Sequence, residues 1–201
     1  MKRDVPEGGA MHCLSVDVEE HFQVTAFESP MRRRHWDQFE SRVRHNTDRV
    51  LELLAQRSAK ATFFVLGWVA ERYPRVVHTI VKAGHELASH GYGHELITAQ
   101  TVKQFRQDVR KTKSILEDVS GQAVAGYRAP SFSITSETVW ALSVLAEEGY
   151  RYDSSVFPSP PYYAAKAAVM GAMAMLGKPK PLSYISRRQR RKMNSGMDVL
   201  G

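Results

Sequence analysis

Hydrophobic positions along the chain alternate between short continuous runs and longer stretches of helical spacing. The runs have the length of strands that are covered on both faces, and they lie at residues 12–17, 61–67, 85–89, 123–127 and 150–153. The longer stretches indicate amphipathic helices, and they lie at residues 46–57, 68–83, 101–119 and 136–148. Strand and helix in strict alternation predict parallel βα units, arranged as a doubly wound sheet or a barrel.

Individual residues predict several details of these elements. Asn46 or Thr47 is the expected N-cap of the first helix. Pro74 begins a second piece within the next helical stretch, and Gly84 ends it. Cys13, the one cysteine, excludes an intrachain disulfide and is expected to be buried because it lies inside the first apolar run.

Polar side chains cluster just after the predicted strands. The residues concerned are Asp17, Glu19, Glu20, His90, His94, Arg128 and Asp153. The carboxyl ends of parallel strands meet at one edge of a sheet or barrel, and active sites form at that edge. The sequence therefore predicts one functional site that is built from four separate segments.

Two histidines and neighbouring carboxylates in this group are suited to a metal ion. His90 and His94 lie in a glycine-containing segment, where a tight loop would turn both rings toward one ion. Alternate residues of a strand share a face, so Asp17 and Glu19 point one way and Glu20 the other. One carboxylate and two imidazoles form a site of the catalytic zinc type, and the second carboxylate can act as a base on water. The alternatives are surface or capping roles for the histidines, and a solvated strand end or helix N-cap for the acidic residues.

These motifs are similar to those of the polysaccharide deacetylase (NodB-like) family. Residues 15–20 (SVDVEE), 89–94 (SHGYGH) and 127–132 (YRAPSF) occur in the order of the family's first three motifs, at similar separations. Residues 152–155 (YDSS) resemble the start of the fourth motif, and the resemblance extends over residues 14–158. The Asp-x-Glu-Glu form of the first motif resembles a subgroup that is linked to bacterial exopolysaccharide synthesis.

The resemblance implies an α/β fold, namely a distorted (β/α) barrel of the NodB-like type, which we expect to be incomplete in its last strands. It also implies metal-dependent hydrolysis that removes N-acetyl groups from the amino sugars of a polysaccharide or oligosaccharide. The expected partner is therefore an N-acetylated carbohydrate, and the expected cofactor is a divalent metal, Zn²⁺, with cobalt and nickel as alternatives.

The resemblance also assigns the metal ligands. His90 and His94 correspond to the two histidines that hold the metal in the family. Members with two adjacent aspartates use the second as a ligand, and this chain has Val18 at that place. The role therefore passes to Glu19, which shares a strand face with Asp17, while Glu20 stays open as the alternative.

Catalytic roles follow from the same comparison. Asp17 corresponds to the general base, and Arg128 to the arginine that pairs with it. Pro130 and Phe132 belong to a loop that would form one wall of the substrate groove. The family's general acid is a histidine in a fifth motif, and no histidine follows residue 94 in this chain; His21 is a substitute only by its closeness in sequence. A non-catalytic metal- or carbohydrate-binding remnant of the family and a hydrolase of a small linear amide therefore stay open as alternatives.

The positive charge of the chain is confined to its last part. Of the net charge of +7, all arises in residues 159–201, which hold eight basic residues and one acidic residue. We expect a flexible leader at residues 1–11, a partial deacetylase domain at residues 12–158, and a basic, Ala/Met-rich tail at residues 159–201. This distribution gives no reason to expect a nucleic-acid partner. Neither a signal peptide nor an apolar run long enough for a membrane span is visible, so a cytoplasmic location is expected.

Overall fold

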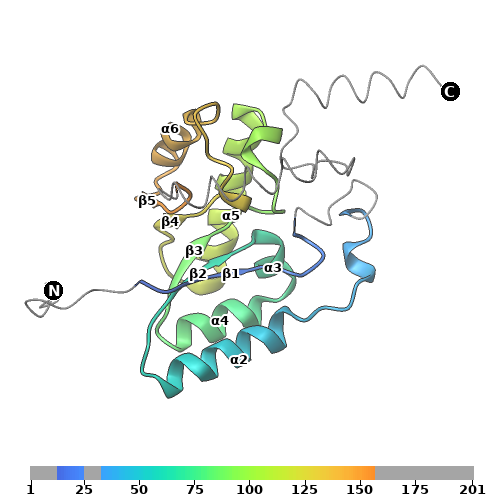
Figure 1. The fold of residues 1–201 in the computed structure, drawn as a ribbon, viewed down its shortest axis with the longest axis vertical. Coiled ribbons are helices and arrows are strands. Elements are labelled where there is room, and N and C mark those ends of the chain that lie inside the picture. The colour runs from blue at the N-terminus through green and yellow to red at the C-terminus, as the bar shows by residue number, and fades with distance from the viewer. Residues whose placement is uncertain (1–12, 25–32, 157–201) are drawn as a thin grey trace, which may run out of the picture.

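The computed structural model describes residues 13–24 and 33–156 (Figure 1). The expected leader at residues 1–11, the expected tail at residues 159–201, and Pro158 at the end of the expected domain lie outside these residues. At the centre of the described part is a sheet of five parallel strands, from which all candidate site residues are positioned.

The strands of this sheet lie in chain order, and each pairs with the next in parallel. They are β1 (Ser15–Val18), β2 (Thr62–Val65), β3 (Glu86–Ser89), β4 (Gly126–Tyr127) and β5 (Tyr152–Asp153). In the register, Asp17 lies opposite Phe64, which lies opposite Ala88. The prediction of an α/β fold with a parallel sheet is confirmed. Within the described residues the sheet is open rather than closed into a barrel, with β1 and β5 as its two edges.

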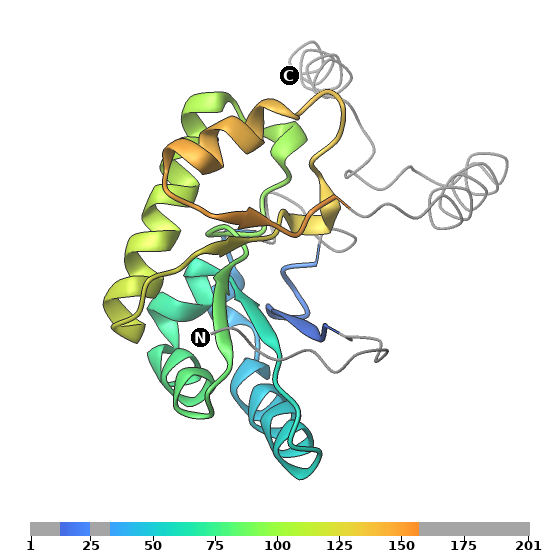
Figure 2. The ribbon, with the colours of Figure 1, turned by 90° about the vertical axis from the view of Figure 1, so that its left-hand side faces the viewer.

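Helices connect successive strands and cover the outer face of the curved sheet (Figures 1 and 2). They are α2 (Val43–Gln56), α3 (Gly67–Arg72), α4 (Pro74–Lys82), α5 (Val102–Ser120) and α6 (Trp140–Glu147), with short 3-10 turns η2 (Trp36–Gln38), η3 (Ile97–Ala99) and η4 (Pro130–Phe132) between them. Helix α5 contacts α3, α4 and α6 and so holds this layer together. None of the helices in the described ranges has both the length and the apolar character needed to cross a bilayer.

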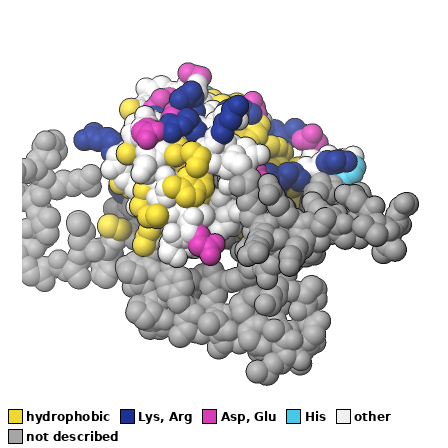
Figure 3. Space-filling model, turned by 90° about the horizontal axis from the view of Figure 1, so that it is seen from above, with side chains coloured by type: hydrophobic (Ala, Val, Ile, Leu, Met, Phe, Trp, Pro, Cys, Tyr) yellow, Lys and Arg dark blue, Asp and Glu magenta, His cyan; other side chains and the backbone are white. Residues whose placement is uncertain are grey.

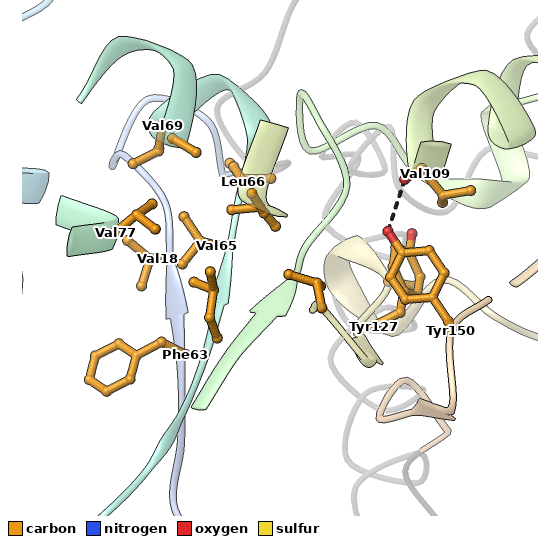
Figure 4. Packing of buried hydrophobic residues seen from close by; sticks show 14 of the residues in the cluster. Val18, Phe63, Val65, Leu66, Val69, Val77, Val109, Tyr127 and Tyr150 are labelled. Atoms are coloured by element: carbon orange, nitrogen blue, oxygen red, sulfur yellow. Dashed lines mark hydrogen bonds between the residues drawn. The ribbon is translucent and has the colours of Figure 1, made fainter. Parts of the chain in front are cut away.

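The hydrophobic core lies between the sheet and this helical layer. Phe63 and Val65 of β2 are fully buried and belong to one cluster with Val18 of β1, Val69 of α3 and Val77 of α4 (Figure 4). Alternate residues of a strand point to opposite faces, and the other face of the same strands carries the polar residues Ser15, Asp17, Thr62 and Glu86. One face of the sheet therefore supplies the core, and the opposite face supplies polar groups to the site.

The first strand differs from its prediction. Within β1 only Val18 is buried, and Cys13 and Leu14 before it are exposed. The prediction of a buried cysteine is therefore wrong. The reason is topological: β1 lies at the edge of the described sheet, and Cys13 precedes Ser15, the first residue in register with β2.

The start of α2 also differs from its prediction. The helix begins at Val43, so neither Asn46 nor Thr47 is its N-cap. Arg42 precedes the helix and makes no side-chain cap. The backbone N–H groups at this end instead donate to the carboxylate of Glu20, 22 residues earlier in the chain. Because this cap comes from a residue distant in the sequence, the local sequence around residue 43 does not predict it.

Candidate active site

Three side chains with metal-ligating atoms come together at the carboxyl edge of the sheet. Glu19 follows β1, and His90 and His94 follow β3. One ligand atom from each lies within 4.8 Å of the others, and Nε2 of His94 is 2.8 Å from Oε2 of Glu19. Two imidazole nitrogens and one carboxylate oxygen are a donor set that Zn²⁺ accepts, and three such ligands leave a position for a further group. The residues present therefore fit the expected metal.

The loop that carries the two histidines is tight, in agreement with its two glycines. Gly91 has φ +75° and His94 has φ +53°, in the left-handed region that residues other than glycine adopt rarely. The backbone N–H of His90 donates to the carbonyl of Val65, and Nδ1 of His90 lies 2.8 Å from the carbonyl oxygen of Arg128. Because a carbonyl only accepts, Nδ1 carries the proton, and Nε2 of the neutral ring keeps its lone pair. Metal-binding histidines are commonly oriented by such a bond.

The electrostatic environment favours the protonation states that metal ligands require. Burial lowers the pKa of His90, and the nearby carboxylates of Asp17 and Glu19 oppose this shift without cancelling it. Burial raises the pKa of Glu19, but the hydrogen bond and the charge of His94, together with the charge of His90, outweigh burial and leave that pKa below its usual value. A neutral imidazole and an ionised carboxylate are the forms that bind a metal ion.

Glu20 lies apart from this group and has a different partner. Its carboxylate accepts hydrogen bonds from the backbone N–H groups of Arg42, at 3.1 and 3.2 Å, and Val43, at 3.3 Å, and from the Ser41 hydroxyl. The side chain is only 1% exposed. His21 lies next to it, with Nδ1 4.0 Å from a Glu20 oxygen and 54% of its side chain exposed. Glu20 is therefore the cap of α2, and Glu19 is the glutamate of this motif that reaches the histidines.

Asp17 and Arg128 form an ion pair beside the histidines. Nη1 of Arg128 lies 2.8 Å from Oδ1 of Asp17. Nη2 donates to the hydroxyls of Ser15 and Ser154, each at 2.9 Å, and the guanidinium group lies 4.0 Å above the ring of Phe64. The Asp17 side chain is 31% exposed. The arginine is thus held on several sides, while the carboxylate that it orients is open to solvent.

The loop after β4 forms the next part of the site. Pro130 is buried, whereas Phe132 is partly exposed, with its ring centroid 5.7 Å from Cζ of Arg128. Ser131 and Phe132 have φ values of 52° and 51°. Two consecutive left-handed residues without glycine are unusual, and such conformations persist only where surrounding contacts impose them.

Two serines of the YDSS motif, to which sequence reasoning gave no role, bond to the residues just before this turn. The hydroxyl of Ser155 accepts a hydrogen bond from the N–H of Ala129 at 2.7 Å and donates to Oδ1 of Asp153 at 2.5 Å. Ser154 holds Arg128, as described above. The YDSS motif was visible in the sequence, but only the structure shows that its serines anchor the loop and the arginine. Asp108 of α5 contacts the loop of residues 90–94, the histidine loop. Sequence reasoning missed it because no pattern within the helix distinguishes it from its neighbours.

The chain is similar in sequence and structure to proteins of one known family. The profile of the family described as "Polysaccharide deacetylase" matches residues 33–152. This range contains His90, His94 and Arg128 but not β1, so the family match does not cover Asp17 and Glu19, which the sequence motif at residues 15–20 and the structure place with them.

Individual relatives agree with this match. A peptidoglycan deacetylase of Helicobacter pylori is 34% identical over 117 residues, which cover 57% of this chain and 39% of that protein. A peptidoglycan-N-acetylglucosamine deacetylase of Bacillus cereus is 34% identical over 96 residues, 47% of this chain and 35% of that protein. The crystal structure of a candidate polysaccharide deacetylase from Mycobacterium smegmatis matches with a TM-score of 0.59 at 31% identity, over 73% of this chain and 51% of that one. The chain thus spans less than two fifths of the length of these two curated relatives.

Proposed function

Since the chain belongs to the polysaccharide deacetylase family, we propose that it hydrolyses the N-acetyl groups of amino sugars in a polysaccharide or oligosaccharide. The observation that carries this proposal is the convergence of Glu19, His90 and His94 within 4.8 Å of one another. The ion pair of Asp17 with Arg128 lies beside them. A metal half-site and an oriented carboxylate are two of the parts that amide hydrolysis of this kind needs, and the departing amine also takes up a proton.

We assign the metal to Glu19, His90 and His94, and we propose Zn²⁺ because of the nitrogen and oxygen donors. When bound, the metal would supply Lewis-acid chemistry, which polarises a carbonyl and lowers the pKa of water. The protein's contribution is to hold the three ligands in their binding forms. The bond from Nδ1 of His90 to the Arg128 carbonyl fixes that ring, and it joins the metal group to the loop after β4.

Asp17 is the group that we assign to take the proton from the attacking water. Its Oδ1 is engaged by Arg128, which leaves Oδ2 to accept the proton. Arg128 orients the carboxylate and touches Phe132 on its other side. Phe132 is the partly exposed aromatic residue of the loop and the side chain that we propose contacts the sugar. Pro130 is buried and acts on the substrate only through the shape of the loop.

The form of the first motif supports the finer proposal of an Asp-x-Glu-Glu enzyme of exopolysaccharide synthesis. In this motif Asp17 and Glu19 reach the site while Glu20 caps α2. Glu20 therefore has a structural function in the motif, beside the proposed base Asp17 and the proposed metal ligand Glu19. The names of the relatives, which refer to peptidoglycan and to N-acetylglucosamine, support a glucosamine-type sugar as the substrate.

Metal content and acetate release test this proposal together. We expect near-stoichiometric zinc in the purified protein and its loss in His90→Ala and His94→Ala. His78→Ala is the matched control, because His78 is an exposed histidine on α4, and it should keep its zinc. The protein should release acetate from N-acetylglucosamine oligomers but not from small linear amides, and both histidine variants should be inactive. Zinc that persists in both variants would show that the metal site lies elsewhere.

A further inference from the structure

The histidine loop is attached to the rest of the protein at Gly91 and Tyr92, two of the three residues between the histidines. The carbonyl of Gly91 accepts a hydrogen bond from the N–H of Gly67, and the carbonyl of Tyr92 accepts one from the N–H of Trp68, each at 2.9 Å. Both donors lie at the start of α3. These bonds hold the carbonyl side of the loop, and the N–H of Tyr92 needs a partner elsewhere.

That partner is Asp108 of α5. The N–H of Tyr92 lies 3.1 Å from each carboxylate oxygen of Asp108. A Cβ atom on Gly91 would lie only 3.1 Å from Oδ1 of the same carboxylate, so the loop passes directly over it. Tyr92 stands midway between His90 and His94, and a contact at this point acts on both rings through the backbone.

A carboxylate is an unfavourable choice for this position if only helix packing matters. Burial raises the pKa of Asp108 to about 6, and the Tyr92 N–H together with the charges of Arg33 and Lys111 opposes the rise. A charge that burial destabilises adds little to stability unless its hydrogen bonds compensate. The Asp108 carboxylate accepts its hydrogen bond from the Tyr92 N–H of the loop. This contact therefore indicates that the role of Asp108 is to hold the loop.

We infer that Asp108 is a positioning residue for the proposed metal site, which holds His90 and His94 in their binding geometry through the backbone of Tyr92. This inference rests on the proposed function, because it assumes that the two histidines bind a metal. Partners that orient metal ligands in this indirect way typically contribute about 10- to 100-fold to metal affinity.

Zinc affinity, measured by competition with a chromophoric chelator, tests the inference in two variants. Asp108→Ala removes the acceptor, and we expect at least about tenfold weaker zinc binding. Asp108→Asn keeps a side-chain oxygen for the Tyr92 N–H without the buried charge, and we expect it to restore the affinity to within about threefold of the unchanged protein. The unfolding midpoint of the metal-free protein should fall little in either variant, since relief of the buried charge offsets the lost bond.

Arg106→Ala is the matched control on the same helix. Arg106 contacts Glu147 and Glu148 rather than the histidine loop. This variant should lower the unfolding midpoint and leave zinc affinity unchanged. Loss of zinc affinity in Arg106→Ala equal to that in Asp108→Ala would mean that general loosening of α5 is responsible, and it would overturn the inference.

Two further outcomes separate the inference from the proposed function. If the unchanged protein binds zinc and Asp108→Ala binds it equally well, the inference is wrong and the proposed function stands. If the unchanged protein binds no zinc, the proposed metal site is wrong. Hydrogen exchange at the Tyr92 amide then decides whether Asp108 holds the loop: faster exchange in Asp108→Ala supports the contact, and unchanged exchange overturns it.

Discussion

Arg128 contacts Asp17 through a single nitrogen, and the rest of its guanidinium group is engaged by neighbours. Nη2 reaches the hydroxyls of Ser15 and Ser154, Nε lies 3.3 Å from the Ser154 carbonyl, and the plane of the group covers Phe64. A planar group with several fixed donors can make these contacts at once, whereas a lysine ammonium on a flexible stem cannot. The position of the Asp17 carboxylate therefore depends on the shape of the arginine as well as its charge.

Replacement of Arg128 by lysine tests this dependence. We expect Arg128→Lys to lower kcat/KM for deacetylation by about 10- to 100-fold, because the charge stays but the orientation of Asp17 is lost. Zinc content should not change, since the Arg128 side chain forms its ion pair with Asp17, which is not one of the proposed ligands. Arg151→Lys is the control, because Arg151 is exposed, and it should keep full activity. Equal rates for Arg128→Lys and the unchanged protein would contradict the assignment.

At the scale of elements, two helices obtain their N-caps in different ways. Helix α5 is capped locally, by a capping box in which Thr101 and Gln104 bond to each other's backbone. Helix α2 has no local side-chain cap and depends on Glu20, which comes from the segment after β1. Because Glu19 and Glu20 are adjacent and point to different partners, the cap of α2 also fixes the backbone that presents Glu19.

Removal of the α2 cap should change stability more than metal content. We expect Glu20→Ala to lower the free energy of unfolding by about 1–3 kcal/mol, because three buried or partly buried donors lose a charged acceptor. Urea unfolding measures this change. Glu40→Ala is the control, since Glu40 is 79% exposed and pairs with the exposed Arg42 side chain, and its effect should be close to zero. Loss of zinc from Glu20→Ala with unchanged stability would show instead that Glu20 is a ligand.

At the scale of the whole molecule, charged groups join the last described βα unit to the central helix. Glu148, whose side chain is 8% exposed, accepts bonds from Arg106 at 2.8 Å and from Arg110 at 2.8 and 2.9 Å. Lys113 donates to the carbonyls of Glu148 and Gly149. Basic and acidic side chains are interspersed on the face seen in Figure 3 rather than gathered by sign. These bonds tie the end of α6 and the turn that follows it to α5.

Acid should weaken this connection over a defined range of pH. The hydrogen bond from Arg110 lowers the pKa of Glu148 to about 2, against burial and with help from Arg106. Because the folded pKa lies below the usual value of 4.5, the ion pairs stabilise the fold above that value, and this stabilisation is lost as the pH falls from there toward 2.

The variant Glu148→Gln measures this contribution. At neutral pH we expect it to lower the free energy of unfolding by about 1–2 kcal/mol. The difference from the unchanged protein should shrink as the pH falls from about 5 to about 3. Glu147→Gln, at a side chain that is 58% exposed, is the control and should have a small effect at every pH. A difference for Glu148→Gln that stays constant over this range would contradict the role of the ion pairs.

Much of the fold and the composition of the candidate site were determined by the sequence alone. Hydrophobic spacing is a local property, and burial on one or two faces requires it whatever the surroundings. It therefore predicted the five strands and the helices between them, with errors of a few residues at their ends. Parallel strands place their carboxyl ends at one edge, so Asp17, His90, His94 and Arg128 could be expected together from their positions after strands. The tight histidine loop followed from its glycines.

The tertiary structure decided which neighbour each polar group meets. Glu19 and Glu20 are chemically alike, and only the arrival of the α2 N-terminus beside β1 made one a cap and left the other at the histidines. The exposure of Cys13 depends on the place of β1 at a sheet edge. The contact of Asp108 with Tyr92 depends on where α5 crosses the loop. Contacts of this kind join elements that are distant in sequence, so no local sequence pattern predicts them. The hydrophobic periodicity that forms each helix or strand is, by contrast, a property of that segment alone.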